Sequence, residues 1–143
     1  MNIRIKRFDT TVPLPAYTTS GAAAFDLASR EEVHILPGKV GYAPLNIVIA
    51  IPEGHTLLLV ARSSLHKRGV MPANAVGIID SDYRGNADEL IAALYNFSDT
   101  EVVLSRGERM MQGLIVPVTR VEFEEVENMD SPDRGGFGST GVH

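Results

Sequence analysis

Short runs of β-branched and aliphatic residues, interrupted by glycine and proline, recur along most of the chain. Residues 45–51 and 56–61 are two such runs, and Pro52-Glu53-Gly54 between them is a turn signal, so the pattern predicts a hairpin. Residues 102–104, 113–118 and 121–126 predict further strands, the last with alternating apolar and charged positions. Many short strands separated by Gly and Pro are typical of a sandwich, jelly roll or barrel, so we expect an all-β fold.

Helix is expected only over residues 63–68, as one turn capped by Ser63 or Ser64 and stopped by Gly69. Residues 87–94 contain good helix formers but lie between strand-like neighbours, and we expect a strand there. No repeat or linker interrupts the chain, and its 143 residues predict one domain. Residues 128–143 have too little apolar surface for a core of their own, which predicts an arm that is disordered or orders on another surface.

Charge and cysteine content restrict the possible partners. The chain carries 18 acidic and 13 basic residues, a net charge of −5. That balance does not favour broad electrostatic binding to DNA or RNA, so we expect no nucleic-acid partner. The chain has no cysteine, which excludes disulfides, thiolate nucleophiles and cysteine metal sites. No apolar run is long enough to span a membrane, and no signal core follows the basic start. We therefore expect a cytoplasmic protein without a membrane partner.

Asp80 and Asp82 lie two residues apart beside Tyr83. In an extended segment both carboxylates would point to the same side, where they could hold a metal ion or orient a water molecule. An ordinary acidic turn explains the same residues, and spacing alone favours that interpretation.

Arg62, Ser63 and Ser64 follow a predicted strand and open the predicted helical turn. A guanidinium, two hydroxyls and free backbone N–H groups suit phosphate oxygens, although a simple N-cap beside a solvated arginine is equally compatible. Residues 134–141 are glycine-rich, so their backbone amides could approach phosphates and Phe137 could stack on a base. Composition alone favours a mobile terminus there. The histidines show no metal-ligand spacing and are expected at the surface: His34, His55, His66 and His143.

Five blocks of this sequence, in order, resemble those of the homotrimeric dUTPase family. They lie at residues 22–29, 62–65 with Gly69, 74–85, 107–112 and 134–141, and they cover nearly the whole chain. The third contains Gly77-Ile78-Ile79-Asp80-Ser81-Asp82-Tyr83-Arg84-Gly85. The resemblance implies a distorted jelly roll or β-barrel with a flexible C-terminal arm, and a homotrimer with three active sites shared between subunits.

The resemblance also implies hydrolysis of dUTP to dUMP and diphosphate with Mg²⁺, which limits uracil in DNA and supplies dUMP for dTMP synthesis. Asp80 would be the general base that orients the water attacking the α-phosphorus, because an aspartate is ordinarily ionised at neutral pH. Tyr83 would pack under the deoxyribose and exclude a 2′-hydroxyl. Backbone groups from Asn74 onward would read the uracil.

On the phosphate side, the resemblance implies that Arg62 and Ser64 contact the phosphates. Asp26 and Gln112 would hold phosphate oxygens or metal-bound waters, so that Asp26 contacts the metal through water. Arg134 would meet the γ-phosphate, and Phe137 would cover the uracil as the arm closes. The substrate-binding residues implied in all are Arg62, Ser63, Ser64, Asn74, Gly77, Ile79, Tyr83, Arg109, Gln112, Arg134, Phe137, Gly138 and Ser139.

The sequence departs from the family pattern in a few places. Ala24, Ala61 and Met111 stand where glycine, proline and alanine are common, and Met111 would add bulk near the phosphate site. Residues 86–89 add about three residues after the third block, which predicts a bulge or local protrusion. The fifth block is shorter between its arginine and its Gly-Phe pair.

Two other functions stay open from the sequence. A dCTP deaminase has the same fold, but a glutamate would be expected near the position of Asp80, and the Ile-Asp-x-Asp-Tyr pattern would be absent. A nucleotide-binding regulatory β-domain without turnover is the second, and the shortened fifth block and Met111 are the features that support it.

Overall fold

The computed structural model describes residues 1–141, and within them strands dominate. The strands are β1 (Ile5–Arg7), β2 (Phe25–Ala28), β3 (Val33–Ile35), β4 (Val40–Pro44), β5 (Ile47–Ile49), β6 (His55–Ala61), β7 (Val70–Pro72), β8 (Gly77–Ile79), β9 (Ile91–Asn96), β10 (Val102–Leu104) and β11 (Arg109–Pro117). One 3₁₀ turn, η1 (Leu65–Arg68), lies between β6 and β7. The predicted all-β class is confirmed.

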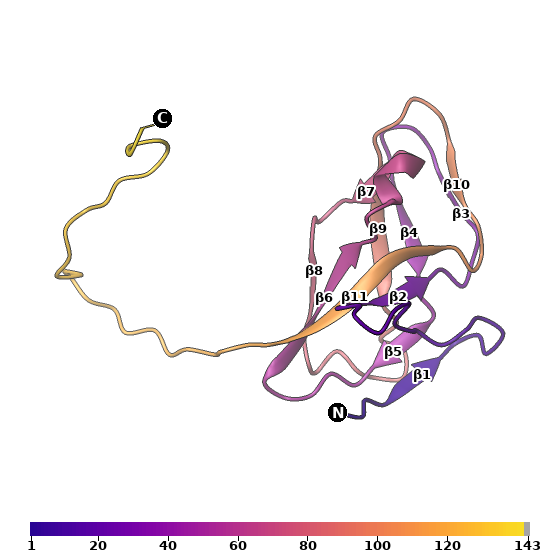
Figure 1. Cartoon of the computed structure of the whole chain (residues 1–143), viewed down its shortest axis with the longest axis horizontal. Helices are drawn as coiled ribbons and strands as arrows, with labels where there is room; N and C mark the ends of the chain where they lie inside the picture. Colours follow the sequence, from indigo (N-terminus) through magenta and orange to yellow (C-terminus); the bar gives the residue numbers. More distant parts are fainter. Residues whose placement is uncertain (142–143) are drawn as a thin grey trace.

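The strands form small antiparallel sheets around one core (Figure 1). The largest has the order β2-β11-β6-β8, a second has the order β4-β9-β7, and β1 pairs with β5 and β3 with β10. The core is largely aliphatic and draws on every sheet; its fully buried side chains include Leu27, Ile35, Ile47, Leu57, Leu94 and Leu104. Nearly every strand partner is distant in sequence, so the fold depends on long-range pairing.

The predicted hairpin of residues 45–51 and 56–61 is wrong. The turn itself exists, because Gly54 has a φ of 73° and the His55 N–H donates to the Pro52 carbonyl at 3.1 Å. However, β5 pairs with β1, whereas β6 pairs with β11 and β8. All three residues of β5 are buried, and a strand buried on both faces carries no alternation that identifies its partner.

The strand predicted at residues 121–126 is also absent. The chain leaves the body after β11 as an extended arm, and no described residue beyond Pro117 belongs to a strand (Figure 1). Val121 is 63% exposed and Phe123 is 96% exposed. These apolar side chains pack on no surface formed by residues 1–141, and a strand forms only with a partner for its backbone.

Two other local predictions are confirmed in whole or part. Ser64 is the N-cap of η1 and Gly69 ends it with a φ of 78°, although the Ser64 side chain makes no capping hydrogen bond. Of residues 87–94, only those from Ile91 onward form strand, in β9. A turn precedes it, in which the Asp88 N–H donates to the Gly85 carbonyl at 3.0 Å.

The histidines within residues 1–141 lie apart from one another in the sequence, and His34 and His66 are exposed while His55 is partly buried. His34 bonds Glu32 at 2.8 Å and Glu101 at 3.1 Å, and these carboxylates raise the pKa of His34. The described residues contain no cluster of three His, Cys, Asp or Glu side chains arranged for a metal ion. His143 lies outside the described residues. No helix within residues 1–141 has the length and apolar character needed to cross a membrane.

Gly113, buried in β11 between β2 and β6, leaves no room for a side chain. A Cβ there would lie 2.6 Å from the Phe25 ring and 2.9 Å from Leu57 Cδ1. We expect Gly113→Ala to lower the free energy of unfolding by about 1–3 kcal/mol, because overpacked cores strain their neighbours. Urea denaturation at one fixed protein concentration measures this. Gly21→Ala, which would meet nothing within 4 Å, is the control. An unchanged midpoint for Gly113→Ala would contradict the packing described.

Candidate active site

One carboxylate holds two arginines at the edge of the largest sheet. Asp26 in β2 contacts Arg62 Nε through Oδ1 at 3.0 Å and Arg109 Nη1 through Oδ2 at 3.1 Å. Arg62 follows β6 and also donates to the Arg109 carbonyl at 3.2 Å. Gln112 lies opposite Asp26 in the β2–β11 register and donates to the Ala61 carbonyl at 2.9 Å. Four of the predicted site residues, Asp26, Arg62, Arg109 and Gln112, are therefore neighbours in the folded chain.

The central position of β11 causes this convergence. It pairs with β2 on one side and β6 on the other, which places the ends of all three strands together. A register shift between Arg109 and Met111 leaves Arg109 exposed while Met110 and Met111 are both buried. The prediction that Met111 adds bulk near the phosphate site is wrong, because this side chain belongs to the core.

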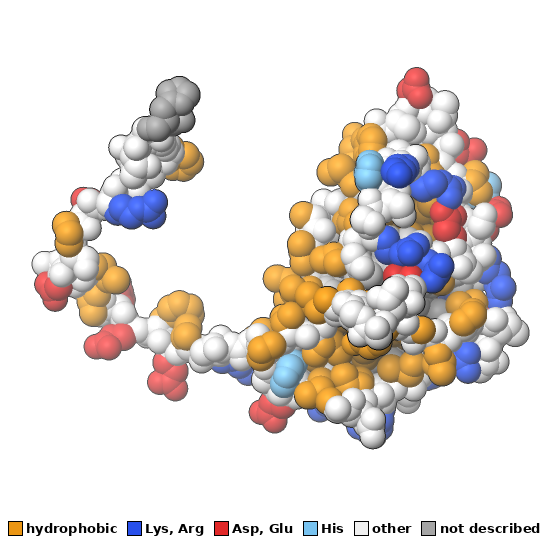
Figure 2. Space-filling model, viewed as in Figure 1, with side chains coloured by type: hydrophobic (Ala, Val, Ile, Leu, Met, Phe, Trp, Pro, Cys, Tyr) orange, Lys and Arg blue, Asp and Glu red, His pale blue; other side chains and the backbone are white. Residues whose placement is uncertain are grey.

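Basic side chains gather over η1 and the start of β11 (Figure 2). The last turn of η1 carries His66, Lys67 and Arg68, and Arg68 pairs with Glu108 and donates to the Val103 carbonyl at 2.7 Å. Ser63 and Ser64 are exposed directly after Arg62. Within a chain of net charge −5, this surface is locally suited to an anion.

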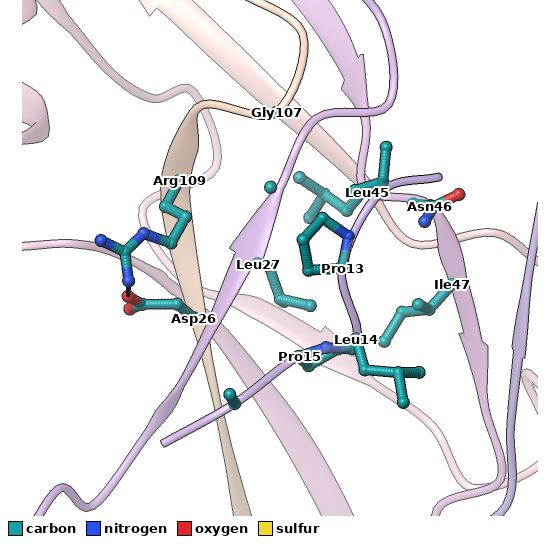
Figure 3. Close-up of a pocket in the computed structure, with 13 residues that line it drawn as sticks. Pro13, Leu14, Pro15, Asp26, Leu27, Leu45, Asn46, Ile47, Gly107 and Arg109 are labelled. Atoms are coloured by element: carbon teal, nitrogen blue, oxygen red, sulfur yellow. Dashed lines mark hydrogen bonds and ion pairs between the residues drawn. The ribbon is translucent and has the colours of Figure 1, made fainter. Parts of the chain in front are cut away.

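A hollow of about 320 Å³ lies beside the arginine cluster, between residues 12–16 and β2 (Figure 3). Asp26 and Arg109 border it, joined by their ion pair, while Leu27 and other apolar side chains, together with Asn46, line the rest. Asp80 does not line this hollow. Of the predicted site residues within the described chain, Asp26 and Arg109 line the hollow and the others do not.

The second group of predicted residues lies on β8 and the turns around it. Gly77 is buried against Leu59, Asn74 is exposed, and the Ile79 carbonyl accepts a hydrogen bond from Thr56 Oγ1 at 2.7 Å. These contacts place the end of β8 firmly against β6. The exposed carboxylate of Asp80 follows immediately.

The segment after Asp80 is a turn, in which the Tyr83 N–H donates to the Asp80 carbonyl at 3.2 Å. The backbone is therefore not extended here. The prediction that Asp80 and Asp82 point to the same side required an extended backbone and does not apply. Tyr83 is 40% exposed, and its hydroxyl donates to the Glu89 carbonyl at 3.0 Å.

The two groups stand at opposite ends of β6. Ile79 pairs with Leu57, so Asp80 continues beside Thr56, whereas Arg62 follows the other end of the strand. Extended chain rises about 3.3 Å per residue, which separates Thr56 from Arg62 by about 20 Å. Asp80 and the arginine cluster of one chain therefore cannot contact the same small ligand group.

The third group lies on the arm, away from both others (Figure 1). Arg134, Phe137, Gly138 and Ser139 are all exposed. Their local structure is a pair of turns, closed by the Ser139 N–H to the Gly136 carbonyl at 3.1 Å and the Gly141 N–H to the Gly138 carbonyl at 2.9 Å. The folded chain does not bring these residues to Asp80 or to the arginines.

A family model described as dUTPase matches residues 10–141. The chain belongs to the dUTPase family. The resemblance drawn from the five blocks is thereby confirmed, and with it the family's jelly-roll-like fold.

Named members of the dUTPase family match over almost the full length. The deoxyuridine 5'-triphosphate nucleotidohydrolase of Dictyoglomus turgidum is 42% identical, with 99% of each chain covered. That of Hahella chejuensis is also 42% identical, covering 96% of this chain and 92% of its own.

Solved dUTPase structures also match. The crystal structure of dUTPase from Streptococcus mutans has a TM-score of 0.78 at 31% identity, covering 86% of this chain and all of its own. A Staphylococcus bacteriophage 80alpha dUTPase with dUPNHPP has a TM-score of 0.86 at 24% identity and covers 99% of both chains, which supports the fold.

Three residues that support the candidate site were not predicted from the sequence. Thr56 bonds the end of β8, and Glu89 accepts both the Tyr83 hydroxyl and the guanidinium of Arg30. Glu89 ends the segment 86–89, which was predicted as a bulge or local protrusion, but no role was predicted for its side chain. No role was predicted for Thr56 or Arg30 either, because each acts through a partner distant in sequence.

Proposed function

We propose that this protein hydrolyses dUTP to dUMP and diphosphate, and so limits uracil in DNA and supplies dUMP for dTMP synthesis. The observation that carries the proposal is the pair Arg62 and Arg109, held side by side by Asp26 next to two exposed serine hydroxyls. Guanidinium groups bind phosphate oxygens with charge-assisted hydrogen bonds. Two guanidinium groups that are held in fixed positions can bind neighbouring phosphates of a polyphosphate. Family membership supplies the identity of the nucleotide.

Asp80 would act as the general base. Its carboxylate is exposed directly after β8, whose end is fixed by the Thr56 bond to the Ile79 carbonyl. It would accept a hydrogen bond from a water molecule and take up its proton as the water oxygen bonds to the α-phosphorus and the diphosphate leaves. Ser63, Ser64 and Gln112 would orient the phosphates during this step.

The nucleoside would lie along β8. Backbone groups between Asn74 and Ile79 would pair with the uracil edge, and Gly77 allows this strand to lie close against β6. The Tyr83 ring would pack under the deoxyribose, leaving no room for a 2′-hydroxyl. A site that excludes one hydroxyl by shape discriminates between dUTP and UTP.

Members of the family use a divalent metal ion, and the residues present fit such an ion bound through the substrate. Asp26 lies between the two arginines on the phosphate side, and both of its oxygens contact them. One carboxylate suits Mg²⁺ that keeps most of its waters and is held chiefly by phosphate oxygens. We propose that Asp26 and Gln112 contact these waters, and that bound Mg²⁺ offsets the phosphate charge.

The active form would be a homotrimer with sites shared between subunits. The separation of about 20 Å between the two ends of β6 supports this, since one chain cannot place Asp80 beside its own arginine cluster. The arm supports it as well, because its large apolar side chains are exposed within the described residues: Val121, Phe123, Val126, Met129 and Phe137. The arm of a third subunit would bring Arg134 to the γ-phosphate and Phe137 over the uracil, with Gly138 and Ser139 completing the closure.

A dCTP deaminase is the weaker alternative, because the family model and both named relatives are dUTPases, and because this chain contains the Ile-Asp-x-Asp-Tyr pattern that a deaminase would be expected to lack. A regulatory domain without turnover is weakened by the burial of Met111, which removes one of its two supporting features. The shortened fifth block is the remaining one.

Diphosphate release from dUTP, dCTP, dTTP and UTP, with and without Mg²⁺, tests the proposal directly. We expect the rate of diphosphate release from dUTP to exceed the rate from the other nucleotides by at least about 100-fold. A nucleotide that fits poorly places its α-phosphorus wrongly, and a small misplacement of reacting groups lowers the rate by about this factor. Release should fall sharply when EDTA removes the metal. Binding of dUTP without any diphosphate release would contradict the enzymatic proposal, and ammonia release from dCTP would support the deaminase.

A further inference from the structure

The carboxylate of Glu89 is buried and fully paired. Glu89 is 7% exposed, and Arg30 donates from Nε to Oε1 at 2.8 Å and from Nη2 to Oε2 at 3.0 Å. The backbone N–H of Asn46 adds a third hydrogen bond, to Oε1, at 2.9 Å. A buried, bidentate ion pair of this kind holds its two backbones in one relative position.

Arg30 is itself held by the body of the protein. Its backbone N–H donates to the Pro44 carbonyl at 2.9 Å, and its guanidinium lies 5.6 Å from the centre of the Phe8 ring. Glu89 raises the pKa of Arg30, so the pair stays charged. Glu89 is therefore anchored to β4 and to the N-terminal segment.

Glu89 also contacts Tyr83, through its backbone. The Tyr83 hydroxyl donates to the Glu89 backbone carbonyl at 3.0 Å. Residues 82–87 are all exposed, so this turn has little packing of its own to orient the tyrosine ring. One end of the turn is held by Thr56 through Ile79, and the other is held by Arg30 through Glu89.

We propose that Arg30 and Glu89 are positioning residues that set the sugar selectivity of the active site by fixing the Tyr83 ring. This rests on the proposed function, in which Tyr83 packs under the deoxyribose. With the ion pair intact, the hydroxyl bond fixes the ring at the depth that excludes a 2′-hydroxyl. Without it, Glu89 and its carbonyl move, the ring tilts, and UTP enters more easily.

The test compares kcat/KM for dUTP and UTP in Arg30→Met/Glu89→Gln, which removes the ion pair without leaving a buried charge unpaired. We expect the preference for dUTP over UTP to fall by about tenfold, the effect of losing one well-placed hydrogen bond. The change should lie mainly in KM, because the reacting groups are not altered. Arg30→Lys keeps the charge and should restore part of the preference. Glu101→Gln removes an exposed carboxylate that pairs with His34 and should leave the preference unchanged.

Tyr83→Phe separates positioning from general stability. It removes the hydroxyl and with it the hydrogen bond to the Glu89 carbonyl. Adding Arg30→Met/Glu89→Gln to it should therefore lower the preference for dUTP over UTP no further. An equal further loss in the Tyr83→Phe background, or an unchanged preference in the pair variant alone, would overturn the proposal.

Amide hydrogen exchange without nucleotide provides a readout independent of the reaction. We expect residues 81–89 to exchange faster in the pair variant and at the wild-type rate in Glu101→Gln. A wild-type protein that does not prefer dUTP over UTP would show that the proposed function is wrong in its sugar selectivity. The exchange comparison would then test only whether the Arg30–Glu89 ion pair orders the turn that contains Tyr83. Faster exchange in the pair variant supports this, and unchanged exchange overturns it.

Discussion

Asp80→Asn is expected to lower dUTP turnover by about 10²–10⁴-fold, the usual contribution of a positioned general base. The amide cannot take up the proton of the attacking water, although it can still accept a hydrogen bond. Asp80 is exposed, and the hydrogen bond that closes its turn uses its backbone carbonyl, so folding should be unaffected. Steady-state diphosphate release, with dUTP binding measured by calorimetry, tests both parts.

Asp82→Asn is the matched control for this variant. Asp82 lies in the same turn, is also exposed, and undergoes the same change of charge. Its described contact is a backbone one, from the Arg84 N–H to the Asp82 carbonyl at 2.9 Å. We expect turnover close to that of the wild type. Wild-type turnover in Asp80→Asn, or an equal loss in both variants, would show that Asp80 is not the base.

Deletion of residues 134–143 is expected to lower kcat/KM for dUTP on the order of 100-fold, because closure of the arm would exclude water and orient the phosphates. The melting temperature should hardly change. Every described residue of this segment is exposed, and its described hydrogen bonds are local turns. Diphosphate release and thermal unfolding of the truncated chain measure the two effects separately.

Single substitutions in the arm test the proposed roles of its residues separately. Phe137→Ala should raise KM through loss of the cover on the uracil, and Arg134→Ala should weaken binding of the triphosphate more than that of dUMP. Arg120→Ala removes an exposed arginine from the same extended arm outside the glycine-rich block and serves as the control. A truncated chain as active as the full one would rule out a closing arm.

Local signals in the sequence were sufficient for some elements. The strand at Val102–Leu104 and the turn that Gly69 ends follow from short-range propensity and from one glycine with a positive φ. The strand predicted at residues 113–118 coincides with β11 at residues 113–117, although β11 already begins at Arg109. These elements form from the conformational preferences of a few neighbouring residues, which can be predicted directly from the sequence.

Strand partners did not follow from the sequence. Residues 45–51 and 56–61 look like a hairpin, yet β5 pairs with β1 and β6 with β11. The alternation at residues 121–126 suggests a strand that this chain alone cannot complete. Pairing is decided by which backbone edges and apolar faces meet during folding, and these come from distant parts of the chain.

The sequence by itself determined the all-β class and, through five ordered blocks, the dUTPase family and its candidate residues. The tertiary structure decided how those residues are distributed. It gathered Asp26, Arg62 and Arg109, placed Asp80 at the far end of β6, and buried Glu89 against Arg30. The reason is physical: a residue's type is local information, whereas its neighbours are set by sheet register and burial, which depend on the whole chain.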